Sequence, residues 1–349
     1  MKKTRFGLLL ILFLLAILVI YEWNSAMIRS KMLEEGKPLP PDPFPITLET
    51  PWWLIPFYTL GNYLSKAWIC LTIAFLIAGA IETFIPKQLI IKHLSNKNIK
   101  SYLIAAVGGP MLSVCSCSII PIFAGIYRRG AGLGPALAFL LAAPAINPAA
   151  ILLTGSMIGW NVALGRIILA VSSAIIVSFI VGGVIFKKMD GEFSGDRLKV
   201  EVLDENFEVS SLTEWIKNTW IFVKKIIPLI LIGIIIVGVI KVVLTPEIIA
   251  SYLGQGVLQT VLASAMGVII YTPTLVEVPF IRGLIEMGMA TGPAIAFLLT
   301  GPALSLPSVF GVTRVISWKV VLTYALLMFI MGVIGGLIFA YLVPSLNIY

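Results

Sequence analysis

Two cysteines in the run Ser113–Ser118 are the residues best suited to chemistry. Thiolates are soft ligands that suit Cu(I) and, by the same softness, trivalent arsenic or antimony. Residues two apart in an extended backbone point to the same side, so Cys115 and Cys117 would suit a two-coordinate soft centre. We expect them, with Ser116 between them, to bind a small thiol-reactive solute or soft metalloid. The plainer alternative is that they pack, since free cysteine is a common small buried residue.

Glu277 is the only acidic residue deep in an interrupted apolar segment. An acid inside a membrane is costly and is commonly functional. We expect Glu277 to carry a coupling proton or to balance the charge of a cation or partner; the structural alternative is an ion pair with Arg282. Arg282 also has the i,i+4 spacing of an ion pair with Glu286.

Two hydrogen-bonding residues lie in proline-bounded breaks of apolar segments. Asn147 belongs to Ala143-Pro-Ala-Ile-Asn-Pro148, and Ser305 belongs to Gly301-Pro-Ala-Leu-Ser-Leu-Pro307. Backbone groups freed by such breaks are tolerated in a membrane only against protein or a water-filled cavity. We expect Asn147 and Ser305 to contact the substrate. Cys70, near the middle of its apolar segment, is open to two interpretations: a third thiol ligand or, more simply, a packing residue.

The elements that must position these residues are membrane helices. Of 349 residues, 59% are hydrophobic and 12% are charged, and the mean hydropathy is +1.02. A soluble domain has roughly 45–50% apolar and about 25% charged residues, so we expect an all-α polytopic membrane protein. The net charge of +8 is typical of cytoplasmic loops facing anionic lipid, rather than of nucleic-acid binding. Three cysteines and one histidine exclude a disulfide framework and a Cys/His zinc site.

Segments of about 20 apolar residues can cross a bilayer. We predict an uncleaved N-terminal anchor at 1–23, with a signal peptide as the alternative, and a Pro-rich extracytoplasmic segment at 24–56. A charged cytoplasmic loop at 187–218, with an amphipathic helix from Leu212, separates two transmembrane repeats at 57–186 and 219–349. The predicted full spans are 57–84, 131–154, 161–186, 219–244, 290–312 and 320–344.

Two further segments, 101–127 and 257–285, are interrupted by Pro, Gly and polar residues. If both are re-entrant hairpins and the N-terminus is cytoplasmic, most of the 25 basic residues lie on the cytoplasmic side, as the positive-inside rule favours. Four charged residues near span ends are expected to extend their side chains to the interface: Lys66, Glu82, Arg166 and Lys241.

The chain also repeats itself. Residues 121–144 align without gaps on residues 279–302, an offset of 158, and Pro121, Gly130 and Pro144 fall on Pro279, Gly288 and Pro302. Each copy has three full crossings, which is odd, so the second copy must be inverted in the membrane. Inverted repeats with broken segments are typical of secondary transporters, whose substrates bind at the repeat interface; a channel is the alternative.

The run Cys115-Ser-Cys-Ser-Ile-Ile-Pro121, followed by Gly130, Gly134 and Ala143-Pro-Ala-Ile-Asn147, resembles the bacterial and archaeal predicted-permease family that includes ArsP-like and YraQ-like proteins. The resemblance extends from about residue 60 to the C-terminus. Some relatives are efflux permeases for trivalent organoarsenicals, and their cysteines are implicated in recognition. The resemblance implies that role for Cys115 and Cys117, with Asn147 in the second part of the motif.

Together these features predict a permease of the plasma (inner) membrane that exports a small thiol-reactive solute, with trivalent organoarsenicals as candidates, driven by an ion gradient. It would use no cofactor and bind no nucleic acid; membrane lipid and the solute are its expected partners. No G-x-x-x-x-G-K-[ST], H-E-x-x-H or G-x-S-x-G motif is present, so no enzyme is expected. The alternatives are a permease for an unrelated anion or metabolite, with incidental cysteines, and a membrane thiol–disulfide oxidoreductase.

Overall fold

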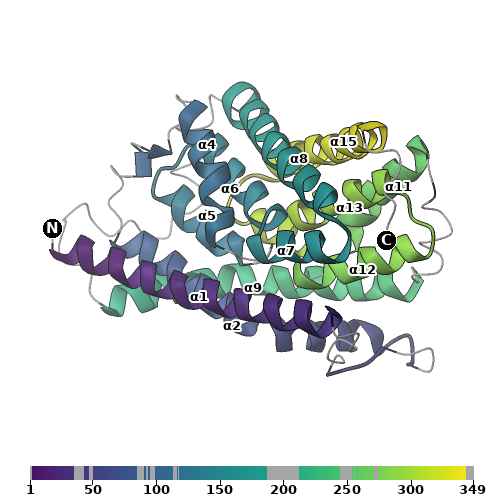
Figure 1. The fold of residues 1–349 in the computed structure, drawn as a ribbon. Helices are drawn as coiled ribbons and strands as arrows, with labels where there is room; N and C mark the ends of the chain where they lie inside the picture. The colour runs from purple at the N-terminus through teal and green to yellow at the C-terminus, as the bar shows by residue number, and fades with distance from the viewer. Residues whose placement is uncertain are drawn as a thin grey trace.

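The computed structural model describes most of the chain, and the described residues form helices without strands (Figure 1). The described residues are 2–34, 43–46, 50–84, 90–91, 93–94, 99–112, 116, 118–186, 212–243, 254, 256–270 and 274–342. Cys115 and Cys117 lie outside this set, as do the side chains of Cys70, Lys66 and Lys241.

The first half of the chain contains two long helices followed by a series of shorter ones. These are α1 (Lys2–Glu34), α2 (Ile55–Phe84), α4 (Ile99–Gly108), η1 (Pro110–Leu112), α5 (Ile119–Arg128), α6 (Leu133–Ala145), α7 (Pro148–Met157), α8 (Trp160–Ser178) and η2 (Phe179–Ile185). The second half contains α9 (Leu212–Val243), α11 (Val257–Ile269), α12 (Thr274–Glu286), α13 (Thr291–Leu304), α14 (Leu306–Val312) and α15 (Trp318–Leu342). The helix α1 therefore extends beyond residue 23, and α9 continues the predicted amphipathic helix at Leu212 directly into an apolar span.

The helix boundaries follow the sequence repeat. With an offset of 158 residues, the first residues of α4, α6, α7 and α8 fall on the first residues of α11, α13, α14 and α15. Gly130 and Gly288 are also related by this offset, and both adopt positive φ, 95° and 105°. That backbone region is unfavourable for residues with a Cβ. Residues related by the offset are called counterparts below.

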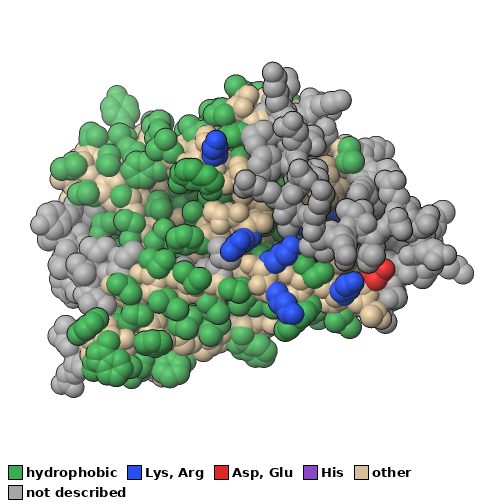
Figure 2. All heavy atoms as spheres, turned by 180° about the vertical axis from the view of Figure 1, so that it is seen from behind, with side chains coloured by type: hydrophobic (Ala, Val, Ile, Leu, Met, Phe, Trp, Pro, Cys, Tyr) green, Lys and Arg blue, Asp and Glu red, His purple; other side chains and the backbone are tan. Residues whose placement is uncertain are grey.

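Five helical segments in the described part of the chain are long and apolar enough to cross a membrane. They match five of the six predicted full spans and are Leu133–Met157, Trp160–Ile185, Thr213–Ile236, Thr291–Val312 and Trp318–Leu342. The sixth predicted span, 57–84, lies in α2. Within α2, Leu71–Phe84 is an apolar helical segment of 10–17 residues. Much of the described surface on the face shown in Figure 2 is hydrophobic, as expected for lipid contact.

The centre of the molecule is formed by α6 and α13, which are counterparts and pack against each other. All residues of α6 are buried, as are all residues of α13 after the first. A helix that is apolar on every side is stable only when it is surrounded. The broken spans built from α6–α7 and α13–α14 therefore form the core, and α8, α9 and α15 form more of the outer surface.

The long helices α1, α2 and α9 lie along one side of the molecule (Figure 1). Trp215, near the start of α9, donates a hydrogen bond from Nε1 to the carbonyl oxygen of Leu76 in the second half of α2, 2.8 Å away. Gly238, near the end of α9, lies against Pro56 at the start of α2, and a Cβ there would collide with it. The counterpart helices α2 and α9 are therefore antiparallel.

The two predicted hairpin segments each contain two short helices: α4 and α5 in the first half, and α11 and α12 in the second. Helices of 10 to 13 residues span about 15–20 Å at a rise of about 1.5 Å per residue. That is about half to two thirds of the hydrocarbon core of a bilayer, which is about 30 Å thick. No member of these pairs is long enough to cross alone.

Candidate functional site

Arg166, in α8, is fully buried and uses its guanidinium to join three other elements. Nε donates to the carbonyl oxygen of Ala145 at 2.8 Å, and Nη1 donates to Oγ1 of Thr154 at 3.1 Å. Nη2 donates to Oε1 of Glu277 and forms a salt bridge with it. The prediction that Arg166 reaches the membrane interface is therefore wrong, because its side chain points inward between α6, α7 and α12.

Glu277 lies in the first turn of α12 and is also fully buried. A carboxylate in the first turn is favoured by the positive end of the helix dipole. Its Oε1 accepts from Arg166, whereas its Oε2 is buried and has no hydrogen-bond partner among the described residues. We call Arg166, Glu277, Thr154 and the carbonyl group of Ala145 the ion cluster.

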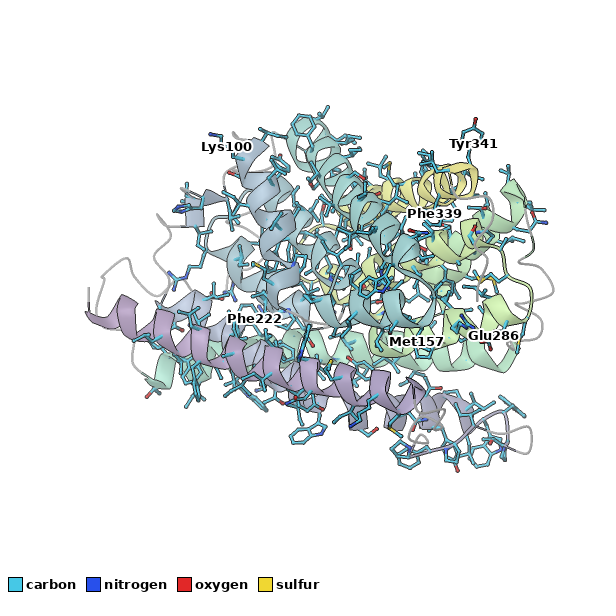
Figure 3. The ribbon with its side chains drawn as sticks, in the orientation of Figure 1. Lys100, Met157, Phe222, Glu286, Phe339 and Tyr341 are labelled. Atoms are coloured by element: carbon cyan, nitrogen blue, oxygen red, sulfur yellow. The ribbon has the colours of Figure 1, made fainter. Side chains whose placement is uncertain are left out.

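Arg282 does not pair with Glu277, so the structural alternative considered for that residue is wrong. Instead, Nε of Arg282 donates to Oε1 of Glu286 at 2.7 Å, which confirms the predicted i,i+4 pair. Nη1 of Arg282 also donates to the carbonyl oxygen of Met157 at 2.9 Å, and Met157 and Glu286 lie in the same part of the molecule (Figure 3). This second contact joins the C-terminal ends of α7 and α12.

The sequence of the break after α6 explains why a carbonyl group is available to Arg166. In a continuous helix, the backbone N–H of Ala149 would donate to the carbonyl oxygen of Ala145. Here it donates to Oδ1 of Asn147 at 2.9 Å, because Asn147 is the N-cap of α7 and Pro148 follows it. The cap releases the Ala145 oxygen, and Arg166 satisfies it. Nδ2 of Asn147 is buried without a hydrogen-bond partner in the described part of the chain.

Ser305 is the counterpart of Asn147 and precedes α14, but its side chain makes no capping bond. Its Oγ lies 2.9 Å from Oγ of Ser308 and 3.3 Å from Oγ of Ser116. Ser308 donates in turn to the carbonyl oxygen of Ser305 at 2.7 Å. Thus the predicted site residues Ser116 and Ser305, 189 positions apart, lie together. Cys115 and Cys117 adjoin Ser116 in sequence and lie outside the described residues.

A narrow internal crevice, too small for a water molecule, lies beside these serines. Hydroxyl groups and apolar side chains line it, and no charged side chain is found among its described lining residues: Ser116, Ile119, Leu140, Pro144, Pro302, Ala303, Ser308, Val312 and Tyr324. Four of these are counterparts of the ion cluster, since Tyr324, Ile119, Val312 and Ala303 correspond to Arg166, Glu277, Thr154 and Ala145. The crevice and the ion cluster thus occupy the same place in the two halves.

The described residues contain no group of three or more His, Cys, Asp or Glu side chains able to hold a metal ion. The predicted soft-metalloid ligands, Cys115 and Cys117, are not among the described residues. Sequence reasoning missed Arg166. The repeat could have drawn attention to it. With the offset of 158 residues, Arg166 in one apolar span aligns with the uncharged Tyr324 in the other.

Comparison with known proteins identifies the family. A family model described as a predicted permease matches residues 56–341. The UPF0718 protein MJ0584 of Methanocaldococcus jannaschii is 32% identical over 345 residues, covering 80% of this chain and 93% of the relative. The UPF0718 protein YraQ of Escherichia coli is 25% identical, covering 82% and 81%. A putative two-component membrane permease complex subunit of Streptococcus mutans is 30% identical over 38% of this chain and 42% of its own length.

No solved structure matches the chain. The family model covers most of the sequence, and the described helices include five of membrane-spanning length and apolarity. The chain therefore belongs to the predicted-permease family and is a multi-pass membrane protein.

Proposed function

We propose that this chain is a secondary-active permease of the inner membrane that exports a small thiol-reactive solute, with trivalent organoarsenicals as the class to test first. The observation that carries the proposal is reciprocal contact between the two halves. Glu277 of the second half binds Arg166 beside the broken span of the first. Ser116 of the first half contacts Ser305 in the broken span of the second. Irregular elements of both halves thereby meet in the core.

The antiparallel packing of α2 and α9 supports an inverted repeat. If both copies crossed the membrane in the same direction, counterpart helices would be parallel; instead, the end of α9 lies at the start of α2. The short paired helices in each half fit re-entrant hairpins in length. An inverted repeat with broken helices at its interface is the architecture of many secondary transporters. We place the N-terminus in the cytoplasm on the distribution of basic residues.

We propose the crevice as the place where the solute binds when the protein opens. Its lining of hydroxyl groups and apolar side chains suits an uncharged solute better than an ion. Ser116 lines it, and Cys115 and Cys117, the proposed thiol ligands, adjoin Ser116 in sequence. An arsenic(III) hydroxyl group exchanges with a thiol to form an As–S bond and release water, with no change in oxidation state. Reversal of this exchange would free the solute on the other side.

We propose Glu277 as the coupling acid, with protons as the driving ion. Acidic residues buried within membrane proteins commonly lie on ion pathways, and Glu277 has one oxygen without a partner among the described residues. Arg166 would balance its charge while it is deprotonated. Protonation would break the ion pair between the halves and permit them to move relative to each other.

The test is uptake of methylarsenite into everted membrane vesicles under an imposed proton gradient. Wild-type protein should accumulate arsenic, and Cys115→Ser/Cys117→Ser should not, with equal amounts of protein in the membrane. Cys70→Ser, assayed in the same way, distinguishes the two interpretations of that residue: a loss of uptake would indicate a third thiol ligand, and unchanged uptake a packing residue. Unchanged uptake by the double variant would refute the thiol site and favour a permease for an unrelated metabolite.

A further inference from the structure

Basic side chains gather where α2, α5 and α9 meet, at the end of α5 opposite the crevice residue Ile119. Figure 2 shows Lys and Arg side chains grouped beside a largely hydrophobic face. We call the following five residues the basic cluster: Arg128, Arg129, Lys217, Lys224 and Lys225. The first two end α5, and the other three lie in the first half of α9.

Arg128 is held in place by two contacts from different helices. Its Nη2 lies 3.0 Å from Oε1 of Glu82 in α2, and both side chains are only 16% exposed. Its guanidinium carbon also lies 5.2 Å from the ring centroid of Phe222 in α9, within the range of a cation–π interaction. Lys225 is three residues beyond Phe222 in α9 and therefore lies on the same side of that helix. Arg128 is thus held in a fixed orientation between α2 and α9.

Among the described residues of α2, α5 and α9, and Arg129 after α5, positive charge exceeds negative charge. Among the described residues of these helices, Glu82 and Glu214 are the only acids against the five basic side chains. Burial lowers the pKa of Arg129, and the charge of Arg128 reinforces this effect while Glu82 opposes it. Nε of Arg129 is buried and has no hydrogen-bond partner among the described residues. The carbonyl ends of α2 and α5 offset part of this excess, each by roughly half a charge. The positive charge that remains on the described residues suits an anionic ligand.

Large apolar side chains next to the cluster indicate where that anion comes from. Ile216 and Trp220 of α9 are 62% and 57% exposed. Nζ of Lys224 lies 5.5 Å from the Trp220 ring centroid. Tryptophan is enriched at the headgroup level of bilayers, where its ring is half in the apolar phase. A soluble anion would contact only the charges, whereas a phospholipid would also cover Ile216 and Trp220 with its acyl chains.

We propose that the basic cluster binds the headgroup phosphate of an anionic phospholipid from the adjacent leaflet. Arg129 and Lys225 provide the donors, Arg128 is oriented by Glu82 and Phe222 to add a third positive charge, and the chains lie on the exposed face of α9. The lipid would join α5, which belongs to the hairpin of the first half, to α9 of the second. This inference does not depend on the transported solute.

The test uses the full-length protein in detergent, with bound lipid counted by native mass spectrometry during titration with phosphatidylglycerol or phosphatidylcholine. Wild-type protein should retain phosphatidylglycerol in preference. Arg129→Gln/Lys225→Gln should weaken that binding by about 25-fold, since each basic residue near an anionic surface contributes about fivefold. Arg314→Gln/Lys319→Gln is the matched control, because it removes two exposed basic residues from another place and should leave binding unchanged.

Three results would overturn the proposal. They are equal retention of the two lipids by wild-type protein, equal loss of binding in both double variants, and full displacement by millimolar inorganic phosphate, which would indicate a soluble-anion site. Monodisperse elution and a similar unfolding temperature must first show that the variants fold. If Arg129→Gln/Lys225→Gln does not fold, Lys225→Gln alone replaces it, with an expected loss of about fivefold.

Discussion

Two counterpart locations in this molecule, related by the repeat, differ in charge. One contains a buried salt bridge, and the other is lined by uncharged side chains. In the first half, Arg166 forms a buried salt bridge with Glu277. At the counterpart location, Tyr324 takes the position of Arg166, and Ile119 takes the position of Glu277. Both residues line the crevice. The backbone framework is shared, since both spans break after a proline-containing helix and resume at counterpart residues. The repeat thus preserved the framework while the side chains diverged into a charged site and an uncharged one.

The N-caps of the two breaks diverged in the same way. Asn147 accepts a hydrogen bond from its own helix, which frees the Ala145 carbonyl oxygen for Arg166. Ser305 makes no capping bond and instead contacts Ser116 of the other half. The cap residue therefore differs together with the other side chains. The ion cluster has a capping asparagine, and the crevice has a serine that does not cap.

The largest expected effect comes from removing one partner of the salt bridge. Arg166→Met should destabilise the protein by about 3–5 kcal/mol, because it leaves the buried carboxylate of Glu277 without its counter-charge. Unfolding in detergent, followed by tryptophan fluorescence, would measure it. The double variant Arg166→Met/Glu277→Leu should regain most of this stability, because apolar pairs often replace buried ion pairs at little cost. It should not regain proton-driven transport. A double variant no more stable than the single one would contradict this account.

Introducing the charge into the crevice tests whether the two locations are equivalent. Ile119→Glu should cost about 1–3 kcal/mol, since the buried carboxyl group can take up a proton but still lacks hydrogen-bond partners. Adding Tyr324→Arg should recover part of this loss, because Arg166 and Glu277 bond at the counterpart positions. Detergent unfolding of the single and double variants provides the comparison. If the second substitution deepens the loss, the framework of the two halves differs more than the helix boundaries suggest.

The glycines that follow α5 and α12 should respond alike to an added side chain. Either Gly130→Ala or Gly288→Ala should cost about 1–2 kcal/mol, because both positions have positive φ. At Gly130 the added Cβ would lie 3.1 Å from Cγ1 of Ile91, and at Gly288 no atom of the described residues lies within 4 Å. Thermal unfolding in detergent would measure both losses, and a variant as stable as the wild type would contradict the backbone argument.

The smallest difference is expected at the two caps. Asn147→Ala should destabilise by about 1 kcal/mol through loss of the N-cap bond of α7. Ser305→Ala should cost about 0.5 kcal/mol, the low end for a neutral hydrogen bond, because Ser305 makes no capping bond. Chemical unfolding of the two variants in the same detergent would compare them. Equal losses would show that the hydroxyl contacts of Ser305 are worth as much as the cap.

Local features were readable without coordinates. Hydropathy predicted five of the long apolar helices in the described part of the chain. A helix that crosses a bilayer needs about 20 consecutive apolar residues, and such a run is evident in the sequence. Proline and glycine marked the breaks at Asn147 and Ser305, since they act on the backbone where they stand. The repeat was visible because it preserved these same residues.

The pairing of side chains across the core could not be predicted from the sequence. Arg166 and Glu277 are separated by 111 residues, and the uniformly apolar helices around them carry no periodic pattern that shows which side faces the other half. Arg166, near the start of its span, was therefore expected at the membrane interface. Because α8 packs against the broken span of α6 and α7, that arginine points into the core, and only the tertiary structure shows which residues it contacts.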